Sequence, residues 1–335
     1  MSHSPSSQSH PVTVAVSGAA GTIGYSLLFR MAAGGMFGPD RPLALRLLEH
    51  PWRMPQLRGV AMEIEDCTFP LVHSLTVTDD PHEAFHAADW IILLAGSPRD
   101  IPRPTRLELL RRNGSIYVEH GRAINAASPT ARILVVAAPC NTNCLIAMRH
   151  AQDVPREHWF ALSRVNQMRA ASMIAKKAGV SVRHVHRVTA WGNHGDRVYV
   201  DLHNVRIGSK PAGDIVTDDV WTRGELQETV RHRAAEVFQL RGLAPAATAA
   251  QAILGTIHSL TTPTPLDRFF SVAVPSDGSY EIPQDVVFSF PLRTEDGKHY
   301  SVVDGLYLDE FAQGELRRNV EQLEEEAVLA EKWFG

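Results

Sequence analysis

Hydrophobic positions along this chain follow two alternating patterns. Short, continuous runs of β-branched and aliphatic residues, the first at Val12–Val16, are separated by segments in which apolar residues recur every three or four positions. Continuous runs are typical of strands buried on both faces of a parallel sheet, and the wider spacing is typical of amphipathic helices. Over the first half the pattern predicts strands at 12–16, 43–48, 75–78, 90–95 and 132–137 and helices at 23–31, 57–69, 81–88 and 107–127.

Strands that alternate with helices indicate an α/β fold with a doubly wound parallel sheet over roughly the first 150 residues. The pattern changes near Asp153–Pro155, so we expect a disordered tail at 1–11, one domain at 12–155 and a second at 156–335. For the second domain the pattern predicts strands at 159–162, 185–191, 198–207, 270–274, 286–290 and 300–303 and helices at 166–178, 218–240, 246–259 and 309–333.

A glycine-rich turn follows the first predicted strand. It has the spacing Gly-x-x-Gly-x-x-Gly and leads directly into an apolar helical pattern. Glycines between a strand and a helix let the backbone approach a pyrophosphate, whose charge then lies on the free N–H groups of the helix N-terminus. Glycine also marks tight turns that bind nothing, so the loop by itself is a weak signal. The candidate dinucleotide-binding residues are Gly18, Gly21, Thr22, Ile23 and Gly24.

An acidic residue ends the second predicted strand and sharpens this interpretation. Glu49 lies 25 residues beyond Gly24, at a place where a carboxylate accepts hydrogen bonds from the ribose hydroxyls of NAD and repels the 2′-phosphate of NADP. The alternative is an ordinary surface glutamate at a strand end. Loop and glutamate together favour NAD, while Arg53, four residues on, keeps NADP open as an alternative.

Composition and charge narrow the class of protein. The 335 residues carry a formal net charge of −4, which gives no indication of a nucleic-acid or anionic-membrane partner. No apolar run reaches the roughly 20 residues that a membrane helix requires, and residues 1–11 lack the apolar segment of a signal peptide. Three cysteines, Cys67, Cys140 and Cys144, have neither disulfide-framework nor zinc-site spacing. We therefore expect a cytoplasmic protein without a metal site.

A loop with three arginines and three prolines follows the strand at 90–95. It begins at Gly96, which we place at the cofactor because ligands lie beyond the carboxyl ends of parallel strands. Arg99, Arg103 and Arg106 follow, just before a long helix. Guanidinium groups bind carboxylates through paired hydrogen bonds, so the loop predicts a lid over a small anionic substrate. The alternative is a set of solvated arginines, although cations are unfavourable at a helix N-terminus.

Several separate segments share their residue order with one enzyme family. They include Gly-Ala-Ala-Gly-Thr-Ile-Gly at 18–24, Glu-Ile-Glu-Asp-Cys-Thr-Phe-Pro at 63–70, Asn-Thr-Asn at 141–143, Trp-Gly-Asn-His at 191–194 and Val-Pro-Ser-Asp-Gly-Ser-Tyr at 274–280. In these segments the chain resembles the malate dehydrogenases, specifically the cytosolic-type branch of the lactate/malate dehydrogenase superfamily. The resemblance implies an N-terminal Rossmann domain, a C-terminal α+β catalytic domain, NAD as cofactor and a homodimer.

The same resemblance implies a reaction and roles for individual residues. The reaction is hydride transfer between NAD(H) and the reacting carbon of a 2-hydroxy acid. His194 matches the family's acid/base, and Arg169 matches the arginine for the carboxylate beside the reacting carbon. Arg99 and Arg106 match the two lid arginines.

Two helix positions that contact NAD in relatives hold Asn113 and His120 in this chain, and His120 replaces the usual glutamine. The chain also departs from the family beside the catalytic histidine. Relatives have an aspartate three residues before the arginine matched by Arg169, and this chain has Asn166. The aspartate accepts a hydrogen bond from the imidazole and stabilises its protonated form, whereas asparagine brings no charge. We therefore expect His194 to be harder to protonate and weaker as the acid in ketone reduction.

Further departures lie on the substrate side. Relatives have an asparagine that contacts the substrate where this chain has Ala138, and the lid is one residue longer between Arg99 and Arg106, so Arg103 competes with Arg106 as a substrate contact. These changes favour an NAD-dependent oxidoreductase that acts on a non-standard anionic 2-hydroxy acid, 2-oxo acid or related alcohol. Two alternatives remain: an ordinary malate dehydrogenase of reduced efficiency, and an NAD-binding protein with a binding or regulatory role and no turnover.

Overall fold

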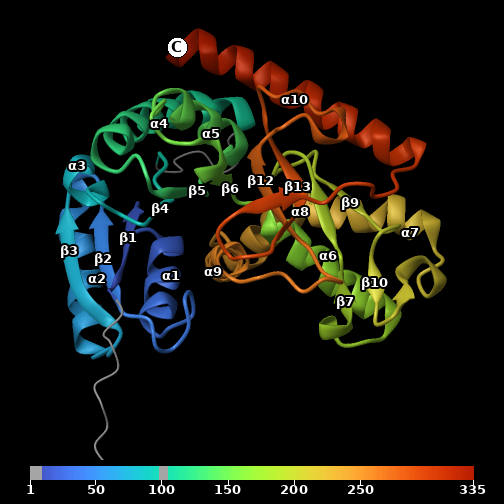
Figure 1. Cartoon of the computed structure of the whole chain (residues 1–335), viewed down its shortest axis with the longest axis horizontal. Coiled ribbons are helices and arrows are strands. Elements are labelled where there is room, and N and C mark those ends of the chain that lie inside the picture. Colours follow the sequence, from blue (N-terminus) through green and yellow to red (C-terminus); the bar gives the residue numbers. More distant parts are fainter. Residues whose placement is uncertain (1–9, 98–104) are drawn as a thin grey trace, which may run out of the picture.

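The N-terminal half of the chain forms a parallel sheet (Figure 1). The computed structural model describes residues 10–97 and 105–335. Its first six strands are β1 (Val12–Ser17), β2 (Leu43–Leu48), β3 (Val72–Thr78), β4 (Trp90–Leu93), β5 (Arg132–Val135) and β6 (Trp159–Ala161). They lie in the spatial order β3-β2-β1-β4-β5-β6, all parallel. The order reverses between β1 and β4, which is where doubly wound sheets bind their ligands.

Helices cover both faces of this sheet, and the strands are apolar for that reason. The helices are α1 (Thr22–Ala32), α2 (Met54–Asp66), α3 (Pro81–Phe85), α4 (Arg106–Ala127) and α5 (Cys140–Arg149). Because successive side chains of a strand point to opposite faces, β1 contributes to two cores. Val14 and Val16 pack in the core that contains Leu27 of α1, and Ala15 packs in the core that contains Tyr117 of α4.

The C-terminal half extends the same sheet and adds two smaller ones. The antiparallel strands β12 (Phe270–Pro275), β13 (Val287–Thr294) and β14 (Tyr300–Val302) continue it beyond β6. The smaller sheets are β11-β10-β7 and β8-β9, formed by β7 (Val185–His186), β8 (Thr189–Trp191), β9 (Tyr199–Asp201), β10 (Arg206–Ile207) and β11 (Lys210–Pro211). The helices are α6 (Arg164–Ala178), α7 (Asp219–Arg223), α8 (Glu225–Arg241), α9 (Ala246–Thr261) and α10 (Glu310–Phe334). This mixture of helices and antiparallel strands confirms the predicted fold class.

Three predicted elements of the second half are shorter than expected. The strand predicted at 185–191 is broken at Arg187, whose φ of 60° lies outside the strand region. The strand predicted at 198–207 ends at Asp201. The carboxylate of Asp201 accepts hydrogen bonds from the N–H groups of His203 and Asn204 and so closes a turn. The helix predicted at 218–240 is divided at Gly224, a residue with little helical preference.

Some sequence expectations lie outside the described residues. These are most of the predicted tail, residues 1–9, and the lid arginines Arg99 and Arg103. Across the parts of the chain that the structure describes, no helix combines the length and apolar character needed to span a bilayer.

Candidate active site

The glycine loop between β1 and α1 is packed too closely for side chains at two of its glycines. Gly18 has a φ of +68°, and a Cβ atom there would lie 2.8 Å from the backbone nitrogen of Ala95, two residues beyond β4. A Cβ atom at Gly24 would lie 2.3 Å from the carbonyl oxygen of Ala19. Gly21, the N-cap of α1, has no side chain to occupy the first N–H groups of the helix. The loop therefore presents free donors and a positive helix end in a space that side chains would fill, which fits the diphosphate of NAD.

Glu49 lies against this loop and is almost fully buried. One carboxylate oxygen accepts a hydrogen bond from the N–H of Ala20 at 3.1 Å and lies 3.6 Å from the guanidinium of Arg53. Arg53 in turn donates to the carbonyl oxygen of Ala20 at 3.0 Å. The acidic residue and the arginine that the sequence proposed as competing cofactor determinants therefore form one ion pair beside the loop.

The ends of β4 and β5 are joined by Asn113 of α4. Its side-chain oxygen accepts from the N–H of Ser97 at 2.8 Å, and its amide nitrogen donates to the carbonyl oxygen of Ala138 at 2.8 Å. A Cβ atom at Gly96 would lie 3.5 Å from the same amide. Three of the predicted site positions, Gly96, Asn113 and Ala138, thus meet at the carboxyl edge of the sheet.

His120 lies two helical turns after Asn113 and is buried. Its ring packs edge-on against Phe85 and Tyr117, with centroid distances of 5.4 and 6.0 Å. Burial lowers its pKa to about 4, so the ring is neutral at physiological pH. Its Nδ1 atom has no hydrogen-bond partner among the described residues. The role of His120 as an NAD contact stays a prediction.

The predicted acid/base His194 and its neighbour Asn166 are brought together from two elements. Asn166 lies in the first turn of α6, and His194 follows β8. The amide nitrogen of Asn166 lies 2.8 Å from Nδ1 of His194. Burial, together with the positive charges of Arg169 and Arg106, lowers the pKa of His194 to about 3. Burial and the two arginines therefore hold the imidazole neutral. The contribution of the missing carboxylate stays a prediction.

Arg169 lies one turn beyond Asn166 on α6, and its charge acts on His194. Burial and the neighbouring Arg233 lower its pKa to about 10, so it stays charged at neutral pH. In the described part of the chain its guanidinium has one hydrogen-bond partner, the carbonyl oxygen of Val230 at 3.2 Å. Its other donors are open to a carboxylate.

Arg106, the first residue of α4, is bound by the protein itself. Its Nε and Nη2 atoms pair side-on with the carboxylate of Glu326 on α10. A second Nη2 hydrogen bond goes to Oδ1 of Asn193 at 2.5 Å, and Nη1 donates to the carbonyl oxygen of His194 at 2.9 Å. Four of the five N–H donors of a guanidinium are thereby occupied. The prediction that Arg106 contacts the substrate stays a prediction.

Sequence reasoning missed the side chains that hold the loop 192–197, which carries His194. Asn141, at the start of α5, accepts from the N–H of His194 at 3.1 Å and donates to the carbonyl oxygen of Gly192 at 3.3 Å. Asn141 belongs to a segment that resembles the family, and that was its one available signal. Three further side chains that hold this loop, directly or through Arg106, lie on α10. They are Asn319, Gln322 and Glu326. Their signal was a row of polar residues at helical spacing within a predicted amphipathic helix.

Comparisons with known proteins agree over nearly the whole chain. A model of the NAD-binding domain of lactate/malate dehydrogenases matches residues 12–160, and a model of the family's α/β C-terminal domain matches residues 164–332. The chain belongs to the lactate/malate dehydrogenase family. It is an NAD-dependent dehydrogenase that acts on a CH–OH group and interconverts 2-hydroxy and 2-oxo acids.

Solved structures from both branches of this family are similar to the chain. Malate dehydrogenase from Naegleria fowleri is 35% identical, with a TM-score of 0.91 over 97% of this chain and 99% of that one. Trichomonas vaginalis lactate dehydrogenase, solved in complex with NADH and oxamate, is 32% identical, with a TM-score of 0.92 over 96% and 98% of the two chains. Malate dehydrogenase from Plasmodium falciparum, at 20% identity and a TM-score of 0.80 over 97% and 100%, shares the fold.

Proposed function

We propose that this dehydrogenase acts on an anionic 2-hydroxy acid and 2-oxo acid pair other than malate and oxaloacetate. The observation that carries the proposal is the 2.8 Å contact between His194 Nδ1 and an uncharged amide, Asn166, in place of a carboxylate. In this reading His194 is the acid/base, Arg169 binds the substrate carboxylate, and Ala138 leaves room for a larger or less polar substituent. NAD, held at the glycine loop and at Glu49, supplies or accepts the hydride.

The neutral amide changes what His194 does with its proton. An aspartate only accepts hydrogen bonds, so it fixes the proton on Nδ1 and leaves Nε2 free to act as a base. Asn166 presents either its nitrogen or, after a half-turn of the amide, its oxygen, and it therefore supports both neutral tautomers of the ring. With a pKa of about 3, His194 is neutral at pH 7. A neutral ring can accept the proton of a hydroxyl group, whereas donation of a proton to a ketone needs the imidazolium. Acceptance of the hydroxyl proton forms the same imidazolium, so we expect the missing charge to slow oxidation as well as reduction.

Arg169 supports the assignment of an anionic substrate. A buried guanidinium with several open donors is unfavourable unless a carboxylate or similar group completes it. Ala138 offers a methyl group where relatives offer an amide. A site with one strong carboxylate anchor and one lost polar contact selects against the second polar end of malate.

The test is a panel of 2-hydroxy and 2-oxo acids assayed with NAD(H) and NADP(H), with malate, lactate and bulkier hydroxy acids included. We expect the highest kcat/KM with NAD and an acid other than malate. Malate as the best substrate, at a rate typical of the family, would overturn the proposal. NADH binding without turnover of any member would instead support the alternative of a non-catalytic NAD-binding protein.

We further propose a homodimer in a reducing cytoplasm. Tyr25, Trp52 and Met62, all on α1, α2 or the turn before α2, are 42%, 57% and 63% exposed, and exposed apolar side chains near one another are typical of an interface. Cys67 is an exposed free thiol, which is compatible with a reducing compartment. Light scattering at a series of protein concentrations measures the oligomeric state, and a monomer at micromolar concentration would contradict the dimer.

A further inference from the structure

The C-terminal helix α10 carries a stripe of polar residues that faces inward. Its members, Glu315, Asn319, Gln322 and Glu326, follow one another at intervals of four, three and four and therefore share one face of the helix. Glu315, Asn319 and Glu326 are 7%, 0% and 3% exposed. Buried polar side chains are costly unless they have partners. For three of the four, the partners lead to the loop that carries His194.

Asn319 and Gln322 bind the loop directly. The side-chain oxygen of Asn319 accepts from the backbone N–H of Asn193 at 2.8 Å, and its amide nitrogen donates to the carbonyl oxygen of Arg197 at 2.6 Å. Gln322 accepts from the side-chain nitrogen of Asn193 at 2.9 Å. The residue before His194 is thus held by its backbone and by its side chain.

Glu326 acts through Arg106. It pairs with the guanidinium in the side-on arrangement and also accepts a hydrogen bond from the hydroxyl of Thr142. The orientation that this pair imposes directs the remaining Arg106 donors at Asn193 and at the carbonyl oxygen of His194, 2.9 Å away. Without Glu326, Arg106 would have no carboxylate partner among the described residues.

Asn319, Gln322, Glu326 and Arg106 together form a clamp on the loop 192–197. The glycines of the loop lie where the clamp residues approach it most closely. A Cβ atom at Gly192, which has a φ of +88°, would lie 2.3 Å from Cγ of Asn319. A Cβ atom at Gly195 would lie 2.8 Å from Nη1 of Arg106. The loop and the clamp are therefore complementary in shape as well as in hydrogen bonding.

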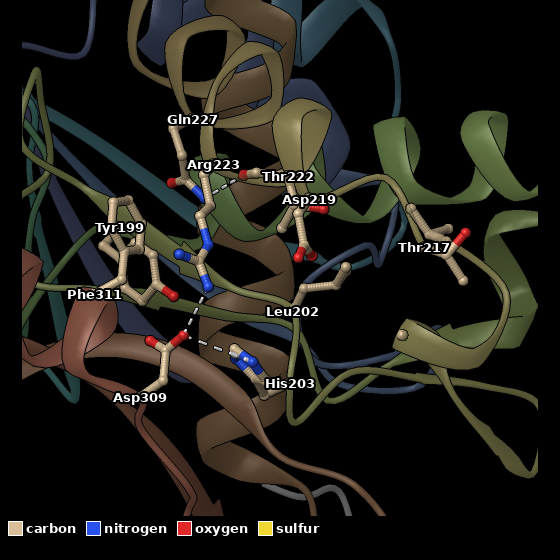
Figure 2. Close-up of a pocket in the computed structure, with 12 residues that line it drawn as sticks. Tyr199, Leu202, His203, Thr217, Asp219, Thr222, Arg223, Gln227, Asp309 and Phe311 are labelled. Carbon is tan, nitrogen blue, oxygen red and sulfur yellow. Dashed lines mark hydrogen bonds and ion pairs between the residues drawn. The ribbon is translucent and has the colours of Figure 1, made fainter.

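The helix itself is anchored at both ends, so the stripe has a fixed position. Figure 2 shows the N-cap residue Asp309 paired with both Arg223 and His203, at distances of 3.2 and 3.8 Å. The three residues line a hollow of about 220 Å³. At the other end the ring of His150, the residue after α5, lies 3.1 Å from the carbonyl oxygen of Phe334. The ion pair between Glu331 and Arg149 beside it, at 2.8 Å, is exposed and of the kind that contributes little to stability. Figure 1 shows α10 lying along both halves of the molecule.

We propose that the α10 stripe positions the catalytic loop, and that Glu326 is a positioning residue that fixes His194 by holding Arg106 against its backbone. The effect on the reaction rests on the proposed role of His194 as acid/base. Arg106 then serves as part of the clamp, with one guanidinium N–H left for other contacts.

The decisive variant is Glu326→Gln, which removes the charge and keeps the size of the side chain. Glu331→Gln is the matched control, because it removes an exposed ion pair from the same helix. Hydrogen–deuterium exchange, read by mass spectrometry, should rise at residues 192–197 in Glu326→Gln and stay unchanged in Glu331→Gln. Gln322→Ala, which removes the loop contacts to Asn193 and Asp196 from a half-buried site, should give a smaller rise. It serves as the test if Glu326→Gln does not fold. NADH binding, measured by fluorescence, should be unchanged in all three.

The kinetic constants kcat and KM distinguish positioning of the loop by Glu326 from other roles of this residue. Misplacement of a catalytic group by about 1 Å can lower a rate about 100-fold, so with the best substrate of the panel we expect kcat to fall roughly 10- to 100-fold in Glu326→Gln with little change in KM. In an Arg106→Met background, Glu326→Gln should cause no further loss. Unchanged exchange at 192–197 in both Glu326→Gln and Gln322→Ala would overturn the proposal.

Two kinetic outcomes would also overturn it. A lower KM with unchanged kcat would mean that Glu326 competes with the substrate for Arg106, and additive losses in the double variant would mean that Glu326 does not act through Arg106. If the wild-type protein turns over no substrate, the proposed function fails, but the exchange measurement still decides whether the stripe holds the loop.

Discussion

The side-chain nitrogen of Asn166 lies 2.8 Å from Nδ1 of His194, so the acid/base candidate of this dehydrogenase has an uncharged partner. The two residues are separated by 28 positions in the chain. Burial and two nearby arginines lower the pKa of the ring to about 3. Because Asn166 adds no negative charge, the imidazolium form has no stabilising partner at this contact.

Asn166→Asp should therefore raise the pKa of His194 and speed proton donation. We expect oxaloacetate reduction at pH 7 to increase at least about 10-fold, since positioned acid–base catalysis contributes about 10²- to 10⁴-fold. The measurement is kcat for reduction as a function of pH, which should show a new limb that declines above the raised pKa. Asn166→Leu is the control that removes the hydrogen bond without adding charge. An equal rate for Asn166→Asp and the wild-type enzyme would mean that this position does not limit reduction.

Ala138→Asn should shift the substrate preference towards malate. A side-chain amide restored beside the substrate adds a polar contact and reduces the room for bulk. One such contact changes discrimination by about 1–3 kcal/mol, or roughly 5- to 160-fold. The measurement is the ratio of kcat/KM for malate to that for the best substrate of the panel. Ala137→Ser, at the adjacent residue, is the control. A preference that is unchanged would place Ala138 outside the substrate contacts.

Glu49→Ser should weaken the preference for NAD over NADP. The substitution removes a charge that repels a 2′-phosphate and releases Arg53 from its ion pair. We expect the ratio of kcat/KM for NAD to that for NADP to fall by about 10-fold or more, the effect of roughly 1.4 kcal/mol. Glu63→Ser on α2, an exposed acidic residue that bonds Tyr25, is the control. An unchanged ratio of the two kcat/KM values would show that Glu49 does not contact the ribose of the cofactor.

His120→Gln should reduce the loss of stability in mild acid. Burial lowers the pKa of His120 from 6.5 to about 4, so between these pH values the unfolded chain binds a proton that the folded chain does not. The free energy of unfolding therefore falls as the pH drops below 6.5, by about 2 kcal/mol at pH 5 for this one group.

Urea unfolding at pH 7.5 and pH 5 measures this effect. The decrease between the two pH values should be smaller in His120→Gln than in the wild type by about that amount, and it should be unchanged in His73→Gln, at an exposed site. An identical decrease in all three proteins would mean that His120 is not neutral in the folded state.

Local patterns in the sequence were sufficient to predict NAD as the cofactor. The strand, the glycine spacing and the acidic residue that ends the second strand all lie within Val12–Glu49, and each follows from backbone requirements that neighbouring residues impose. The order of the elements likewise determined the parallel sheet, because a strand followed by a helix returns to the same sheet in one hand. The resemblance to family motifs identified His194, Arg169 and Asn166 as candidate site residues, but it gave no distances between them.

Only the tertiary structure decided what Arg106 binds. Its partners lie 87, 88 and 220 positions further along the chain, whereas the sequence predicted a lid arginine that contacts an anionic substrate, with a solvated arginine as the alternative. A long side chain reaches whichever acceptors the packing of distant elements places around it, and the packing of α10 against α4 has no local signature. The charge of a residue could be read from the sequence, whereas the partner of that charge depended on which helices meet.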